Sequence, residues 1–104
     1  VPGVFEIPGT VEKLKNKNYN AIICIGAIIK GETDHYHYIS DAVSNGIMNL
    51  STYSKIPIIF GVLTCQNIDY AKKGSSKDLS KNKGYEVGKA TIEMIKVFNE
   101  NNLS

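Results

Sequence analysis

Two apolar runs rich in β-branched residues limit what this chain can fold into. The first is AIICIGAIIK at residues 21–30, and the second is IPIIFGVLTC at residues 56–65. Each run has the length of one β-strand and is apolar at nearly every position, not only at every second one. Strands of a parallel sheet that is covered on both faces have this composition. We therefore expect two parallel strands, each buried on both faces.

The segments around these runs have the spacing of helices. Residues 5–17 predict a short helix that begins near Pro8, and the polar, lysine-rich residues 66–84 predict a short helix and a loop. Longer amphipathic helices are expected at residues 36–50 and 82–99, because apolar residues recur there every three or four positions. These positions are Tyr36, Ile39, Val43, Ile47 and Leu50 in the first, and Val87, Ala90, Met94 and Val97 in the second. Alternating strands and helices predict an α/β fold with a doubly wound parallel sheet.

The predicted sheet is small for a domain of this class. The opening residues 1–6 have the composition of the end of a third strand, and two parallel strands alone bury little apolar surface. The chain has 104 residues, of which 42% are hydrophobic and 21% charged, which predicts one globular domain, residues 1–104. We expect this domain to be shortened at its N-terminus and to be completed by neighbouring subunits.

Charge and cysteine content exclude several classes of function. The net charge of +2 is too small to indicate binding to nucleic acid or to an anionic membrane. All 12 basic side chains are lysine, so an anion site must use lysine or backbone N–H groups instead of a guanidinium fork. Cys24 and Cys65 both lie inside apolar runs, which predicts buried, reduced thiols in a cytosolic protein. No apolar run approaches the roughly 20 residues of a membrane span.

The motif GAIIKGETDHYHY, residues 26–38, contains both histidines of the chain. It lies where the first strand is followed by a helix, and ligands of α/β proteins bind at such carboxyl ends of strands. A glycine turn before a helix N-terminus offers N–H groups and a positive dipole to an anion. Thr33 or Asp34 is the expected N-cap, and His35 in the first turn is a candidate proton carrier.

Other interpretations of these residues remain open. A histidine near a helix start is more often a surface or capping residue than a catalytic one. His35 and His37 are two positions apart and so point in different directions on a helix, which disfavours a metal site. Glu32 and Asp34 fit solvated loop charges as well as an acid–base pair. The lysines of residues 72–83 fit either a phosphate site or a soluble surface.

Four motifs in this order resemble one family. They are VPGVFEIP at the start, IGAIIKGETDHYHY, IPIIFGVLTCQN and NKGYEVGKATIEMI, and together they extend to about residue 98. In order and spacing they are similar to lumazine synthase (6,7-dimethyl-8-ribityllumazine synthase), a cytoplasmic transferase of riboflavin biosynthesis. The resemblance implies a flavodoxin-like three-layer sandwich with a parallel sheet, from which the family's first strand and helix are absent. That strand lies inside the family's sheet, so residues 1–104 alone are expected to fold poorly or to be inactive.

The resemblance also implies a reaction and an assembly. Family members condense 5-amino-6-(D-ribitylamino)uracil with 3,4-dihydroxy-2-butanone 4-phosphate to 6,7-dimethyl-8-ribityllumazine, the penultimate step of riboflavin biosynthesis, without metal or organic cofactor. They form homopentamers, some of which build a 60-subunit cage, and the site lies between adjacent subunits. The partners expected here are thus the small-molecule substrates and further copies of this chain.

Roles of individual residues follow from the resemblance position by position. His35 matches the catalytic histidine, and Phe60 matches the aromatic residue that a neighbouring subunit donates. A lysine is expected to replace the family's phosphate-binding arginine, which aligns with Gly74. The full set implied for pyrimidine and ribityl binding is Val4, Phe5, Glu6, Ala27, Ile28, Ile29, Phe60 and Lys83. The set implied for phosphate binding is Glu32, Thr33, Lys73 and Lys77.

Two alternative functions are compatible with the same scaffold. One is the pentameric riboflavin synthase of archaeal type, against which the turn GETDH argues. The other is a homologue without catalytic activity that serves as an assembly or shell protein. Phosphate release that depends on substrate separates the enzyme from the assembly protein.

Overall fold

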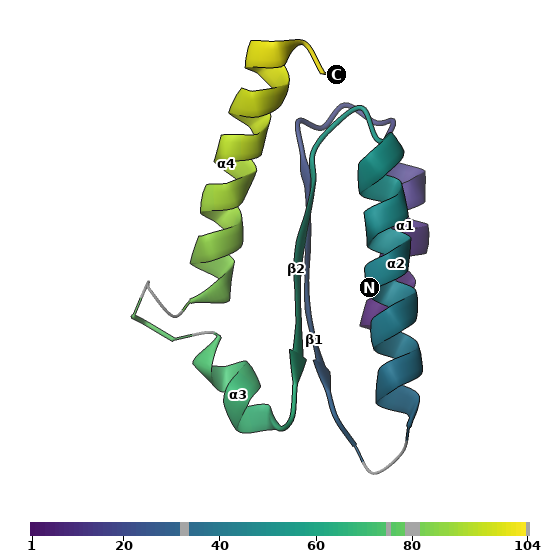
Figure 1. The fold of residues 1–104 in the computed structure, drawn as a ribbon, viewed down its shortest axis with the longest axis vertical. Coiled ribbons are helices and arrows are strands. Elements are labelled where there is room, and N and C mark those ends of the chain that lie inside the picture. The colour runs from purple at the N-terminus through teal and green to yellow at the C-terminus, as the bar shows by residue number, and fades with distance from the viewer. Residues whose placement is uncertain (32–33, 75, 79–81, 104) are drawn as a thin grey trace.

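The computed structural model describes all residues except 32–33, 75, 79–81 and 104. The side chains of residues 68, 70 and 71 are also left out of the description. In chain order, the elements are η1 (Val4–Glu6), α1 (Ile7–Leu14), β1 (Ile22–Ile29), α2 (His35–Tyr53), β2 (Ile58–Cys65), α3 (Ile68–Lys73) and α4 (Lys83–Asn101). The helices α1 and α2 cover one face of the sheet, and α4 lies on the other face (Figure 1). The α/β prediction is therefore confirmed, and both predicted strands are present.

The sheet contains β1 and β2 in parallel, with Ile22 aligned to Ile58. At one end the Ile22 N–H donates to the Pro57 carbonyl at 3.0 Å, and at the other the Lys30 N–H donates to the Cys65 carbonyl at 2.9 Å. Because backbone groups of a strand alternate between its two edges, even-numbered residues of β1 bond to β2. Among the described residues β1 pairs with β2 alone, so its odd-numbered residues face an open edge.

The hydrophobic core lies between the sheet and the two helices α1 and α2. Its buried members are Ile7, Val11, Cys24, Ile28, Val43, Ile47, Ile58 and Val62. The predicted helical positions Tyr36, Ile39 and Leu50 pack against this cluster. Gly46 lets the two helices approach, since a Cβ at this position would lie 3.0 Å from the ring of Pro8. The apolar spacing of residues 36–50 thus identified the correct face of α2.

The opposite face of the sheet is covered more completely over β2 than over β1. Val87 of α4 is buried, and a Cβ on Gly61 would lie 3.1 Å from its side chain. On β1, however, Ile23, Ile25 and Ile29 are 41%, 63% and 42% exposed. Burial on both faces was therefore a wrong prediction for β1. For β2 it is correct except at Phe60, which is 43% exposed, and at Thr64, which is exposed.

Two further expectations are corrected by the structure. The opening residues form the 3-10 turn η1, not the end of a strand, with the Glu6 N–H bonded to the Gly3 carbonyl at 3.2 Å. On α4, Met94 and Val97 remain more than a third exposed, whereas Thr91 is buried and its hydroxyl donates to the Val87 carbonyl at 2.6 Å. The buried side of α4 therefore includes Val87 and Thr91, and the predicted positions Met94 and Val97 lie nearer its exposed side.

No helix within the described residues has the length and apolar character needed to cross a membrane.

Candidate functional site

A cavity of about 420 Å³ lies at the carboxyl end of β1. Three segments line it: the η1 turn, the end of β1 and the first turns of α2. Seven residues implied by the family resemblance are among its lining residues: Val4, Phe5, Glu6, Ala27, Ile28, Ile29 and His35. Residues as far apart in the sequence as Val4 and His35 therefore contribute to one site at the end of β1, where ligands of parallel α/β sheets bind.

The η1 turn reaches the site because it packs directly on β1. The side chain of Val4 packs directly against Gly26. A Cβ atom added to Gly26 would lie 2.6 Å from Cγ1 of Val4. Behind the turn, the Thr10 hydroxyl donates to the Glu6 carbonyl at 2.8 Å and ties η1 to the first helical turn of α1. Phe5 is 60% exposed beside the cavity, which leaves an aromatic surface available to a flat ligand.

His35 is the first residue of α2 and lines the cavity. The positive end of the α2 helix dipole lies at the same place. Asp34 occupies the predicted N-cap position, but its side chain makes no capping hydrogen bond, and its carbonyl accepts from the His37 N–H at 3.0 Å. The predicted position is thus correct, while the predicted side-chain cap is not formed.

The second histidine, His37, is not part of this cavity. The ring of His37 contacts Tyr36 edge-on, with 5.2 Å between ring centroids. His37 is not among the residues that line the cavity. No cluster of three metal-ligating side chains occurs within the described part of the chain. The structure therefore assigns the two neighbouring histidines to different surroundings.

The predicted phosphate turn is only partly visible. Glu32 and Thr33 lie outside the described residues, so their predicted role stays a prediction. Gly31 on one side of them lines the cavity, and His35 on the other does as well.

Two of the predicted binding residues are not in this cavity. Phe60 is the third residue of β2, aligned with Cys24, and is 43% exposed. Lys83 begins α4 and lines a second cavity of about 420 Å³ on the α4 side of the sheet, which adjoins the first at Ala27. A single chain therefore does not bring Phe60 and Lys83 to the side chain of His35.

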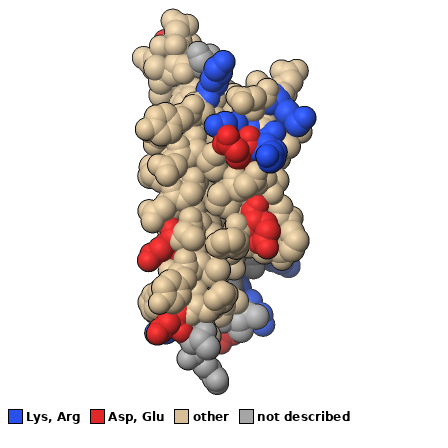
Figure 2. All heavy atoms as spheres, turned by 90° about the vertical axis from the view of Figure 1, so that its right-hand side faces the viewer, with Lys and Arg blue, Asp and Glu red and all other residues tan. Residues whose placement is uncertain are grey.

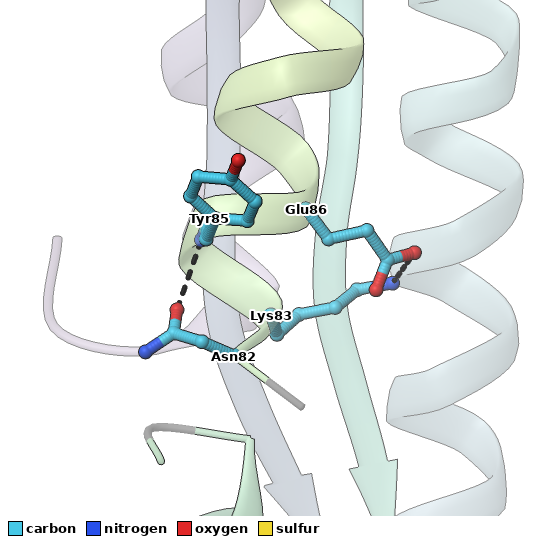
Figure 3. A network of polar contacts seen from close by, with 4 residues as sticks. All are labelled: Asn82, Lys83, Tyr85 and Glu86. Atoms are coloured by element: carbon cyan, nitrogen blue, oxygen red, sulfur yellow. Dashed lines mark hydrogen bonds and ion pairs between the residues drawn. The ribbon is translucent and has the colours of Figure 1, made fainter. Parts of the chain in front are cut away.

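Lys83 is embedded in a compact polar arrangement at the start of α4 (Figure 3). Asn82 caps the helix by accepting a hydrogen bond from the Tyr85 N–H at 2.9 Å, and Lys83 pairs with Glu86 at 3.3 Å. The Lys83 N–H also donates to the Gly74 carbonyl at 2.7 Å, which fastens the turn after α3 to the helix. An exposed pair of this kind contributes little free energy, so the lysine can exchange its partner for a ligand.

The lysines predicted to bind phosphate lie on the same side as Lys83. Lys73 ends α3, and Lys77 follows in the turn, where the Ser76 N–H donates to the Lys73 carbonyl at 3.2 Å. Both side chains are exposed. Neither lysine lines the cavity that contains His35.

Gly31 also lines the cavity, as expected of the glycine turn after the first strand. Three further residues of the cavity were not predicted from the sequence, and they are Gly3, Tyr36 and Ile39. The helical spacing of Tyr36 and Ile39 predicted that both pack in the core. They pack against the core and also line the cavity, because α2 begins at the edge of the sheet.

The family model described as 6,7-dimethyl-8-ribityllumazine synthase matches residues 1–99. The chain belongs to the lumazine synthase family. Its parallel α/β layers agree with the flavodoxin-like fold of that family. Lumazine synthases are transferase-type enzymes of riboflavin biosynthesis that form oligomers and act on small molecules.

Proposed function

We propose that this chain condenses 5-amino-6-(D-ribitylamino)uracil with 3,4-dihydroxy-2-butanone 4-phosphate to form 6,7-dimethyl-8-ribityllumazine. The observation that carries the proposal is the convergence of η1, the end of β1 and the start of α2 on one cavity in a member of this family. An exposed aromatic side chain, apolar strand residues and a histidine at a helix N-terminus are suited to a flat ring and an acid–base reaction.

In the proposed reaction, the amine of the uracil attacks the ketone, and loss of water gives an imine. Elimination then releases inorganic phosphate, and closure of the second ring releases another water molecule. Each step moves protons between carbon, nitrogen and oxygen, which an imidazole can accept and return near neutral pH. We assign this proton transfer to His35, whose place at the helix N-terminus also puts it beside an anion site.

The remaining roles divide between two copies of the chain. Val4, Phe5 and Glu6 with Ala27, Ile28 and Ile29 would hold the pyrimidine and ribityl groups, and Glu32 and Thr33 would hold the phosphate. Phe60, Lys83 and one of Lys73 and Lys77 would come from a neighbouring subunit, which is supported by their distance in the fold from the His35 cavity. We propose a cytoplasmic homopentamer, free or within a 60-subunit cage, as the active form, in which neighbouring subunits complete the single domain 1–104 and its site.

The test is formation of lumazine fluorescence after both substrates are mixed with the protein. His35→Ala is expected to lower the rate by a factor of about 10²–10⁴, the usual contribution of a general acid–base group. His37→Ala is the matched control, because His37 belongs to the same helical turn and packs on Tyr36 outside the cavity. An oligomeric protein that forms no lumazine, or a His35→Ala variant with the original rate, would contradict the proposal. The first of these results would favour an assembly protein without catalytic activity.

A further inference from the structure

The cavity that contains His35 has no lysine in its described walls. Glu6 is the only aspartate, glutamate or lysine among the described residues that line it. Asp34 adds a second carboxylate one residue before His35, and this side chain makes no capping hydrogen bond. Because like charges repel each other, a substrate with a phosphate group needs a permanent positive charge near these two carboxylates.

Lys30 is the lysine nearest to this cavity along the chain. It is the only lysine between residues 18 and 54, and its neighbours Ile29 and Gly31 both line the cavity. Neither η1 nor α2 contains a lysine. On the side of the molecule that carries α1 and α2, the largest group of lysine side chains lies near the upper end, away from the lower end where α2 begins (Figure 2). Lys30 is therefore the one lysine that the segments around the cavity can supply.

The backbone directs Lys30 toward the face of the sheet on which His35 lies. The Lys30 N–H donates to the Cys65 carbonyl at 2.9 Å, so the hydrogen bonds between β1 and β2 continue to this residue. Side chains two positions apart in a strand point to the same face. Ile28 is buried in the core between the sheet and the helices α1 and α2. Lys30 thus leaves the chain on the side where α2 begins at His35.

The ammonium group of Lys30 is available to a ligand. The residue is exposed, and its side chain has no hydrogen bond or ion pair within the described part of the chain. Lys83, by contrast, is already paired with Glu86 at 3.3 Å. The long, flexible stem of a lysine lets its charge move toward an anion. Lys30 can therefore reach the rim of the cavity without giving up another partner.

We propose that the ammonium group of Lys30 binds the phosphate group of the substrate, from the same chain as His35. The inference rests on the proposed function, which assigns a phosphate-bearing substrate to this cavity. An ammonium group acts as a point charge with three N–H donors, so it can approach an anion at the glycine turn without a fixed orientation. A lysine from a neighbouring subunit adds to this charge and does not replace it.

The experiment compares the same substitution at the two ends of β1. Lys30→Gln removes the charge and keeps a polar side chain. Lys17→Gln is the matched control, because Lys17 is also exposed and lies in the turn between α1 and β1, at the opposite end of the strand. Lys30→Arg keeps the positive charge and tests for rescue. Since both lysines are exposed, all three variants are expected to fold, and far-UV circular dichroism verifies this.

Binding of inorganic phosphate is measured by a phosphorus NMR titration, with no other substrate present. The Kd of phosphate is expected to rise about fivefold or more in Lys30→Gln, because one charge pair near the surface is lost. Lys17→Gln and Lys30→Arg are expected to bind phosphate as the unmodified protein does. The difference should shrink as salt is added, because salt screens exposed charges. An unchanged Kd in Lys30→Gln, or an equal loss in Lys17→Gln, would overturn the inference.

Steady-state kinetics separate this inference from the proposed function. In Lys30→Gln, KM for 3,4-dihydroxy-2-butanone 4-phosphate is expected to rise by the same factor as the Kd of phosphate, while KM for the pyrimidine substrate stays unchanged. An equal rise in both KM values would contradict the inference, since it indicates a general disturbance of the site. Phosphate binding that depends on Lys30 in a protein that never forms lumazine supports the inference and contradicts the enzyme. Lumazine formation with both KM values unchanged in Lys30→Gln supports the enzyme and contradicts the inference.

Discussion

Replacement of Gly26 by alanine is expected to disturb the candidate cavity at the end of β1 more than alanine at any other described glycine. The new Cβ would lie 2.6 Å from Cγ1 of Val4 and 3.8 Å from Cδ1 of Ile7. Carbon atoms in contact are separated by about 3.5–4.0 Å, so Val4 must retreat by about 1 Å. Valine is branched at Cβ and has few rotamers into which it can turn. The backbone of η1 must therefore move away from β1.

The size of the effect follows from this overlap. Forcing one extra carbon into packed surroundings costs about 1–3 kcal/mol of the free energy of unfolding. Because Val4 and Phe5 form one wall of the cavity, the same movement displaces the surface that we assign to the pyrimidine ring. A misplacement of about 1 Å can lower a rate up to a hundredfold. We expect KM for the pyrimidine substrate to rise by about tenfold or more.

Denaturant unfolding followed by circular dichroism measures the stability, and steady-state lumazine formation measures KM. Gly9→Ala is the control, because Gly9 lies in the neighbouring helix α1 and a Cβ there meets no atom within 4 Å. That variant is expected to keep its KM and to gain up to about 1 kcal/mol of stability. If Gly26→Ala leaves both the unfolding midpoint and KM unchanged, the packing of η1 on β1 does not position the site.

Further predictions concern the helices and one thiol. Gly46→Ala and Gly88→Ala both replace a helical glycine, which changes the helix propensity by about 1 kcal/mol. A Cβ atom at position 46 would lie 3.0 Å from the Pro8 ring, whereas a Cβ atom at position 88 would have no atom within 4 Å. We therefore expect Gly88→Ala to be the more stable variant by about 1–2 kcal/mol in denaturant unfolding, and equal gains would refute the packing argument. Burial raises the pKa of the Cys24 thiol above its usual 9.0, so alkylation by iodoacetamide at pH 8 should be at least about tenfold slower in the native than in the denatured protein. Since the folded pKa exceeds the unfolded one, the contribution of this thiol to stability is present below about pH 9 and is lost as the pH rises further; labelling at equal rates would contradict its burial.

Sequence reasoning located the strands and the inner face of α2 correctly, because local geometry within one chain determines them. The apolar runs located β1 and β2, and the spacing of Val43 and Ile47 located the inner face of α2, because strand and helix periodicities depend on local geometry. The grouping of η1, the end of β1 and His35 followed from parallel topology together with the family resemblance.

Sequence reasoning was less successful where the packing of neighbouring elements or subunits determines which side chains are buried. The exposure of Ile25 could not be inferred from its apolar run, since the run is the same whether one or both faces are covered. The burial of Thr91 and the exposure of Met94 on α4 depend on how that helix packs on the sheet, which its periodicity alone does not specify. The places of Phe60 and Lys83 in a site depend on a second chain, which no periodicity within one chain can specify.

The open edge of β1 also determines how its backbone meets water. The amides of Ile22 and Lys30 are bonded to β2, and the alternation of the strand gives Cys24 and Ile28 the same direction. The amides of Ile23, Ile25 and Ile29 point to the opposite edge, where among the described residues no strand receives them. In a single chain, protection against hydrogen exchange is therefore expected to alternate with a period of two residues along β1. The strand that supplies the centre of the core also contains amides that exchange without any unfolding.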